Sequence, residues 1–219
     1  MPDPRQIDIH DGDATVHGDL TVPPGASGLV VFAHGSGSSR HSPRNRFVAE
    51  GLQDGSLATL LMDLLSDEEE RADAIDRRHR FDIDLLAGRL EAAMDGLADE
   101  PDVASLPLGL FGASTGAAAA LVAAARRPDA VKAVVSRGGR PDLAGDALES
   151  VRCATLLIVG GDDRPVIGMN EEAAARMPVD AELRIVPGAT HLFEEPGALE
   201  QVVEHARAWF TRHLVERAG

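Results

Sequence analysis

The chain has 219 residues, in which 36 acidic and 21 basic side chains give a net charge of −15. Hydrophobic residues make up 44% of it, enough for a buried core, and the length suits one domain spanning residues 1–219. A chain with this negative charge is not expected to bind nucleic acid or an anionic membrane, because it has no excess of basic side chains to neutralise phosphate groups. A single cysteine, Cys153, excludes an intrachain disulfide.

The first residues, Met1 to Asp13, are acidic and lack the apolar centre of a signal peptide. The longest apolar-looking run, residues 108–125, is interrupted by glycine and hydroxyl side chains and is too weakly hydrophobic to span a membrane. We therefore expect a soluble, cytoplasmic protein without a membrane partner.

Short apolar runs alternate with amphipathic segments along the chain. Residues 7–9 and 14–22 predict an antiparallel pair joined through Asp11-Gly12-Asp13. Six later runs predict buried, parallel strands: 29–33, 57–61, 108–111, 131–135, 155–159 and 182–186. The expected architecture is an α/β fold with an eight-stranded, mostly parallel sheet.

Helical segments fit between these runs. Apolar residues recur every three or four positions over residues 83–97 and 199–210, which is typical of a helix with one buried face. Further helices are expected at residues 43–52, 117–126 and 170–176, and the acidic stretch 67–76 is expected to be a solvated loop or the start of a helix. This alternation predicts helices on both faces of the sheet.

The segment Gly112-Ala113-Ser114-Thr115-Gly116 lies between the fifth predicted strand and a predicted helix. A serine on such a tight turn projects its hydroxyl above the sheet, and the flanking glycines allow the close backbone approach that the turn requires. A capping serine in a glycine-rich turn is the alternative. The position of the turn in the strand order favours Ser114 as a nucleophile.

A serine hydroxyl needs a base to remove its proton. His191 follows the last predicted strand, so it belongs to the edge of the sheet where Ser114 also lies. A carboxylate must orient the histidine, and Asp162 and Asp163 both follow the strand at 155–159. Asp163 is preferred, Asp162 is its rival, and the pair could instead cap the next helix.

The oxyanion formed during acyl transfer needs two hydrogen-bond donors. The backbone N–H of Thr115 directly follows the nucleophile, and the N–H of Ser36 lies in the Gly/Ser-rich loop after the third strand. That loop could also bind phosphate, but it lacks the Gly-Lys-Ser/Thr ending of a P-loop.

Four pieces in this order resemble the α/β-hydrolases, most closely the compact dienelactone-hydrolase-like branch: Phe32-Ala-His-Gly-Ser-Gly, Gly112-Ala-Ser-Thr-Gly, Leu157-Ile-Val-Gly-Gly-Asp-Asp and Gly188-Ala-Thr-His. The resemblance covers nearly the whole chain. It implies a triad of Ser114, Asp163 and His191, and its Gly-Gly-x-Asp pattern favours Asp163. Dienelactone hydrolase itself has a cysteine nucleophile, whereas this chain has Ser114, which argues against dienelactone as the substrate.

The connection between the sixth and seventh strands, residues 138–152, is too short for a large helical lid, so small or polar substrates are expected. Arginines follow two strands at the same edge, and Arg40, Arg44, Arg137 and Arg140 are candidates for binding an anionic group of the substrate. Ion pairs with the abundant carboxylates, for example Asp142, are the alternative.

The sequence thus predicts a serine hydrolase that cleaves a small carboxylic ester or lactone through an acyl-enzyme. An acyltransferase, thioesterase or amidase with the same triad is the alternative, and so is a non-catalytic small-molecule binding module on this fold. No metal or cofactor is expected, because metal-ligand spacings are missing and Gly35-Ser-Gly37-Ser-Ser-Arg40 fails the dinucleotide pattern at its last position. The oligomeric state is not predicted.

Overall fold

The computed structural model describes residues 2–179 and 181–215. Its strands form one sheet in the order β1-β2-β4-β3-β5-β6-β7-β8. Their bounds are β1 Arg5–Asp11, β2 Ala14–Thr21, β3 Leu29–Ala33, β4 Ala58–Met62, β5 Leu108–Ala113, β6 Val131–Arg137, β7 Ala154–Gly160 and β8 Ala181–Val186.

Strand direction follows from the lengths of the connections. β1 and β2 are joined by a tight turn at Gly12, whose φ of +59° suits a glycine, and they pair antiparallel. β2 also pairs antiparallel with β4, whereas the pairs from β4 through β3 to β8 are parallel. The expected eight-stranded, mostly parallel sheet is confirmed, because helical crossovers leave every strand from β3 to β8 pointing the same way.

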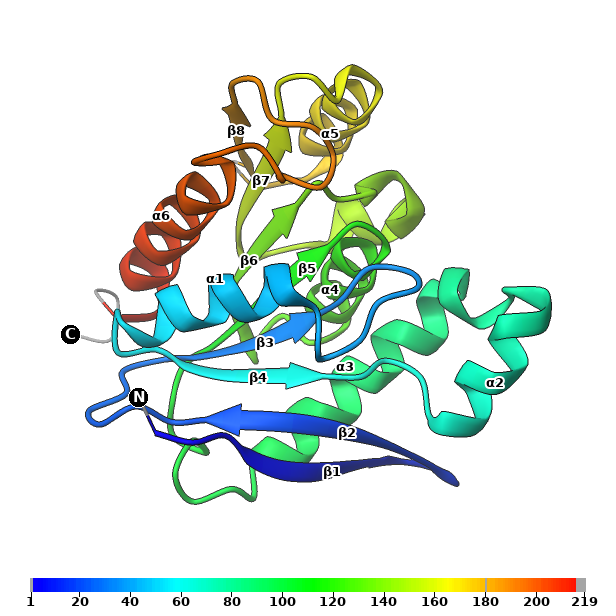
Figure 1. Ribbon diagram of the computed structural model, residues 1–219, viewed down its shortest axis with the longest axis vertical. Coiled ribbons are helices and arrows are strands. Elements are labelled where there is room, and N and C mark those ends of the chain that lie inside the picture. The colour runs from blue at the N-terminus through cyan, green and yellow to red at the C-terminus, as the bar shows by residue number, and fades with distance from the viewer. Residues whose placement is uncertain (1, 180, 216–219) are drawn as a thin grey trace.

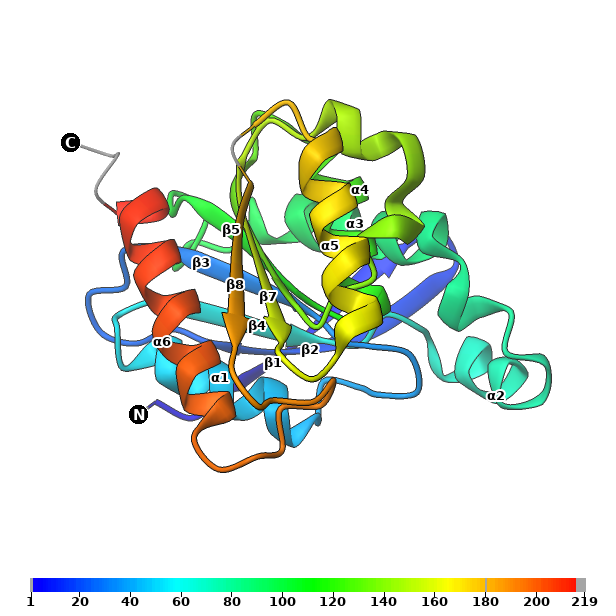
Figure 2. The ribbon, with the colours of Figure 1, turned by 90° about the horizontal axis from the view of Figure 1, so that it is seen from above.

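Helices cover both faces of the sheet, as Figures 1 and 2 show. α1 (Pro43–Gln53) and α6 (Ala198–Phe210) lie on one face, and α3 (Ile83–Leu97), α4 (Thr115–Arg126) and α5 (Arg164–Arg176) lie on the other. A separate apolar core fills each interface. The central strands β3 and β4 are buried at every residue, which explains why they appear in the sequence as continuous apolar runs.

For the acidic stretch the second of its two expected alternatives is correct, and one other helix begins earlier than expected. The acidic stretch forms the helix α2 (Asp67–Asp76), because Ser66 and Glu69 cap its first turn reciprocally and four acidic side chains favour a helix N-terminus. α5 begins at Arg164, six residues earlier than expected, because Pro165 is well tolerated in a first helical turn. α2 lies beyond the carboxyl ends of β3 and β4 (Figure 1).

The connection from β6 to β7 contains a 3₁₀ segment, Pro141–Ser150, and no lid is evident, as expected. Shorter irregular helical turns occupy His79–Phe81 and Thr211–Val215. Within the described residues, every helix is too short or too polar to cross a bilayer. The loops at the carboxyl ends of the parallel strands carry the candidate site.

Candidate active site

Ser114 connects β5 to α4 in a backbone conformation that side chains rarely adopt, with φ 51° and ψ −119°. Its backbone is held on both sides, since the Ser114 N–H donates to the carbonyl of Arg137 at 3.2 Å and the Arg140 N–H donates to the carbonyl of Ser114 at 3.1 Å. Such strain persists only where the surroundings enforce it, and it is common at functional sites. The serine is half-buried at the carboxyl edge of the sheet.

The glycines beside the elbow are required by packing. A Cβ on Gly112 would collide with the backbone of Ala117, and one on Gly116 would collide with the carbonyl oxygens of Ala33 and His34. α4 therefore starts directly against the end of β3. This close approach brings the loop after β3 to Ser114, because a Cβ on Gly35 would lie 3.2 Å from that of Ser114.

His191 and Asp163 meet at the same edge. The Nδ1 atom of His191 lies 2.7 Å from Oδ2 of Asp163, whereas the neighbouring Asp162 is exposed. The two loops are joined by backbone hydrogen bonds, since the Asp162 N–H donates to the carbonyl of Ala189 at 3.0 Å. Asp163, rather than Asp162, is thus placed to fix the tautomer of the His191 ring.

The loop that carries His191 is held by a carboxylate that the sequence reasoning did not select. Glu195 accepts hydrogen bonds from the Thr190 N–H at 3.0 Å and from the Thr190 hydroxyl at 2.6 Å. These bonds lower the pKa of Glu195 below its ordinary value. The position of Glu195, four residues after the predicted catalytic histidine, could have suggested that its carboxylate holds this loop.

Ser114 and His191 line one pocket of about 260 Å³, together with Gly35, Ser36 and other residues. Within the described residues, no hydrogen bond joins the Ser114 hydroxyl to the His191 ring. Catalytic hydrogen bonds are often long before substrate binds, so this geometry is compatible with a nucleophile and base that close on each other.

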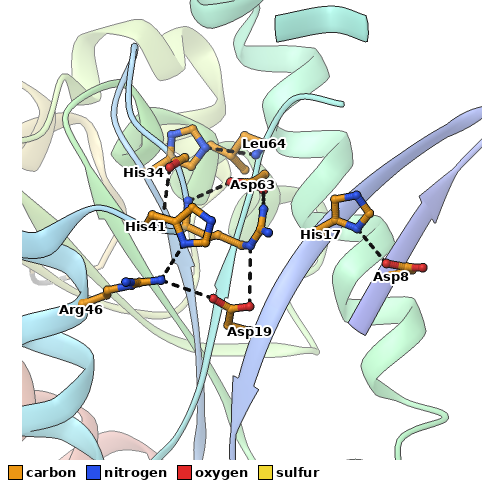
Figure 3. Close-up of polar contacts among 10 residues, drawn as sticks. Asp8, His17, Asp19, His34, His41, Arg46, Asp63 and Leu64 are labelled. Carbon is orange, nitrogen blue, oxygen red and sulfur yellow. Dashed lines mark hydrogen bonds and ion pairs between the residues drawn. The ribbon is translucent and has the colours of Figure 1, made fainter. Parts of the chain in front are cut away.

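The loop with Ser36 is tied to the end of β4, as Figure 3 shows. The ring of His34 contacts the carbonyl of Gly35 through Nδ1 at 2.9 Å and accepts the Leu64 N–H through Nε2 at 3.1 Å. These partners assign a neutral ring with its proton on Nδ1. Burial lowers the pKa of His34, which keeps the ring neutral.

Arg40 holds the other end of the same loop against Asp63. Its backbone N–H donates to Asp63 at 2.8 Å, and its guanidinium pairs with Asp63 and, at 3.6 Å, with Asp19. The loop is thereby anchored at both ends. Ser36 lies exposed between these anchors, and Thr115 is buried in the first turn of α4, where its N–H is free of the helical hydrogen-bond pattern.

A second pocket, of about 270 Å³, lies on the other side of the Gly35–Ser38 loop and includes Thr115. Leucine and alanine side chains form much of its lining: Leu64, Leu65, Ala74 and Leu86. Glu70 also lines it, and burial together with neighbouring carboxylates raises the pKa of Glu70. Gly35, Ser36 and Ser38 line both this largely apolar pocket and the pocket with Ser114.

The four candidate arginines have different surroundings. Arg40 is neutralised by two carboxylates, as described above. Arg140 is half-buried and pairs with Asp142 at 2.7 Å, the ion pair named above as the alternative to anion binding. Arg44 and Arg137 both line the pocket with Ser114, and Arg137 is buried there. Of the four, Arg44 and Arg137 line the pocket with Ser114, whereas Arg140 contacts Ser114 through its backbone N–H alone.

Three further lining or supporting residues were not selected from the sequence. Asn45, in the first turn of α1, accepts a hydrogen bond from Arg137 at 3.4 Å, and Leu192 lines the same pocket. The ring of Phe193 is stacked under the guanidinium of Arg137 at 5.8 Å. The sequence offered one indication that Leu192 and Phe193 lie at the site, because both directly follow His191.

Fold and site together define an α/β-hydrolase. The family model that matches the chain is that of the dienelactone hydrolase family, over residues 52–214, a range that includes Ser114, Asp163 and His191. The chain belongs to this family.

Among curated proteins, the chain is 59% identical over 210 residues to a Mycobacterium tuberculosis protein (strain H37Rv) provisionally named a phosphoribosyl transferase. The match covers 96% of this chain but only 46% of that protein. The chain therefore spans about half the length of this relative.

Among solved structures, a dienelactone hydrolase from Anabaena variabilis has 56% identity and a TM-score of 0.94, covering 97% of this chain and 100% of that one. Est1E from Butyrivibrio proteoclasticus has a TM-score of 0.80 at 16% identity, covering 95% and 98% of the two chains, a likeness in fold alone.

Proposed function

We propose that the protein is a serine hydrolase that cleaves a small carboxylic ester or lactone through an acyl-enzyme intermediate. The observation that carries this proposal is the pocket that Ser114, on a strained strand–helix turn, lines together with His191, whose ring is paired with the half-buried carboxylate of Asp163. The dienelactone hydrolase family membership supports it.

The steps follow from these positions. The Ser114 oxygen attacks the ester carbonyl carbon while Nε2 of His191 takes its proton, and Asp163 stabilises the resulting imidazolium through Nδ1–H. The N–H groups of Ser36 and Thr115 hold the oxyanion. The intermediate collapses, the alcohol leaves with the proton from His191, and water then releases the acid by the same route in reverse.

The pocket dimensions favour small substrates. The two pockets beside the elbow measure about 260 and 270 Å³, at the low end for small-molecule sites, and no lid extends them. We expect a higher kcat/KM for acetate and butyrate esters than for long acyl chains.

The proposal is tested with p-nitrophenyl acetate and p-nitrophenyl butyrate. The wild-type protein hydrolyses both, and Ser114→Ala loses at least about 10³-fold in kcat. Ser105→Ala, which removes an exposed hydroxyl in the turn before β5, serves as the matched control and retains full activity. A wild-type protein that is inactive on esters, thioesters and lactones, or a Ser114→Ala variant as active as wild type, contradicts the proposal.

Acyl transfer uses the same intermediate with an alcohol or amine in place of water. Adding methanol or glycine amide to the reaction and measuring ester or amide product separates the two outcomes. The hydrolytic proposal expects the free acid to remain the main product.

A further inference from the structure

We propose that the protein forms a two-fold symmetric dimer in which the β8 strands of two copies pair antiparallel, in the register that sets Leu183 opposite Leu183 of the partner subunit. This pairing continues the sheet from one subunit into the other. The inference does not depend on the proposed function, because it uses no residue of the candidate active site.

β8 is an open edge of the sheet. In the described chain it pairs with β7 and with no other strand, and in Figure 2 it lies in front of β7, between α6 and α5. An unpaired edge presents free N–H and C=O groups to other chains, and proteins usually protect it with bulges or proline. β8 has neither, and Ile185 is 40% exposed on it. The edge is therefore suited to pairing with another strand.

The backbone direction within β8 follows from one hydrogen bond. The Gly161 N–H, directly after β7, donates to the carbonyl of Val186 at 2.8 Å, so the backbone groups of Val186 face β7. Successive residues of a strand direct these groups to opposite sides, and β8 follows β7 in an unbroken register. The N–H and C=O groups that point away from the sheet therefore belong to three residues: Ala181, Leu183 and Ile185.

Charge selects one symmetric register. A two-fold dimer joins the same surface of both subunits, so one residue of the strand lies opposite its own copy. If that residue is Glu182 or Arg184, two like charges face each other, which is unfavourable. If it is Leu183, an apolar pair lies on the axis, and each Glu182 lies opposite the partner subunit's Arg184. Of the three central residues of β8, Leu183 alone gives attraction at every charged position.

The same register satisfies the free backbone groups. Leu183 faces its own copy, and Ala181 faces Ile185 of the partner subunit, so every outward N–H and C=O meets another outward group. Glu182 and Arg184 then occupy the positions without inter-subunit hydrogen bonds, where side chains of an antiparallel pair come closest. These two side chains already pair with each other within one subunit. In the dimer, two carboxylates and two guanidinium groups alternate across the axis.

The two faces of β8 match the pairing as well. Glu182 and Arg184 lie on the α6 side, where they line a groove of about 170 Å³ with Trp209. The other face of the strand is apolar, and Ala181 packs there against the core under α3, α4 and α5. The exposed Ile185 side chain is covered by the partner subunit on this apolar side, while the charges meet on the other.

The mass in solution, measured by light scattering after size exclusion, tests the dimer and its register. We expect the wild-type protein at twice the chain mass of 23.1 kDa. Glu182→Arg and Arg184→Glu each give a monomer, because like charges then face each other. The double variant with both substitutions is a dimer again, and so is a mixture of the two single variants. Asp8→Arg, the same change of charge on the exposed side of β1 at the other end of the sheet, stays dimeric.

Proline substitutions test the backbone direction. Leu183→Pro removes an N–H that points away from β7, so this variant keeps its stability towards urea and becomes monomeric. Arg184→Pro removes an N–H that faces β7 and therefore unfolds at a lower urea concentration than wild type. If Leu183→Pro does not fold, the mixture of Glu182→Arg and Arg184→Glu still decides the register.

Three outcomes overturn the inference. A wild-type protein that stays monomeric up to about 0.1 mM leaves this edge to a different protein or to solvent. A Glu182→Arg variant that is as dimeric as wild type places the interface elsewhere. A folded double exchange variant that remains monomeric excludes the register centred on Leu183. The proposed function is tested apart from all three, since Ser114→Ala loses ester hydrolysis and keeps the dimer.

Discussion

At the scale of single residues, two neighbouring aspartates offer a matched comparison. Asp163 contacts His191 at 2.7 Å, and Asp162 points to solvent one position earlier. We predict that Asp163→Asn lowers kcat by about 10³- to 10⁴-fold, because the histidine loses the partner that fixes its tautomer. Asp162→Asn stays within about threefold of wild type. Steady-state kinetics on p-nitrophenyl acetate measure both, and the reverse order would assign the triad acid to Asp162.

His34, in its neutral form, ties the Gly35–Ser38 loop to the end of β4. Because burial lowers its folded-state pKa below the ordinary 6.5, the unfolded chain binds more protons at acidic pH. Stability is therefore unaffected by this residue above about pH 6.5 and falls as the pH drops below it, by up to about 1.4 kcal/mol per pH unit.

Urea unfolding at pH 7.5 and 5.5 measures this dependence. His34→Asn reduces the loss of unfolding free energy between the two pH values. His10→Asn, which changes an exposed histidine on β1, does not. An identical pH dependence in wild type and His34→Asn would show that His34 is not held neutral.

At the scale of secondary-structure elements, the junction of β5, α4 and β3 depends on the absence of a side chain at Gly116. Adding a methyl group drives it into the carbonyl oxygens of Ala33 and His34. We predict that Gly116→Ala lowers the unfolding free energy by about 3 kcal/mol or more.

Gly168, in the middle of α5, is the matched control, because a Cβ there meets no atom within 4 Å. Gly168→Ala raises the unfolding free energy by about 0.5–1 kcal/mol, since alanine favours a helix more than glycine does. Urea denaturation measures both variants. A Gly116→Ala protein as stable as wild type would mean that α4 can move away from β3.

At the scale of the whole molecule, Cys153 reports on global unfolding. It lies buried just before β7 in the larger of the two cores, and burial raises the pKa of its thiol to about 11. We predict that Ellman's reagent modifies it at pH 8 only as fast as the protein unfolds, and stoichiometrically in urea. Rapid modification of the native protein would place the thiol at a mobile surface.

Most of the sheet could be predicted from the sequence, because strands buried on both faces are continuous apolar runs and the elbow glycines stand at a strand–helix boundary. The helix α2 could be predicted only as one of two alternatives, because its composition is acidic and its clearest signal is the Ser66–Glu69 capping box. The burial of Arg137 could not be predicted from the sequence. It depends on Phe193, which lies in a loop more than fifty residues later and contacts Arg137 at the end of β6.

The central claim is that the hydroxyl oxygen of Ser114 is the nucleophile, and a covalent probe tests it most directly. A fluorophosphonate phosphonylates an activated serine with loss of fluoride, so intact-mass and peptide mass spectrometry of the treated protein should show one adduct, on Ser114. Ser114→Ala should show none, and His191→Asn should react far more slowly. An unlabelled wild-type protein, or an adduct on a different residue that persists in Ser114→Ala, would contradict the account.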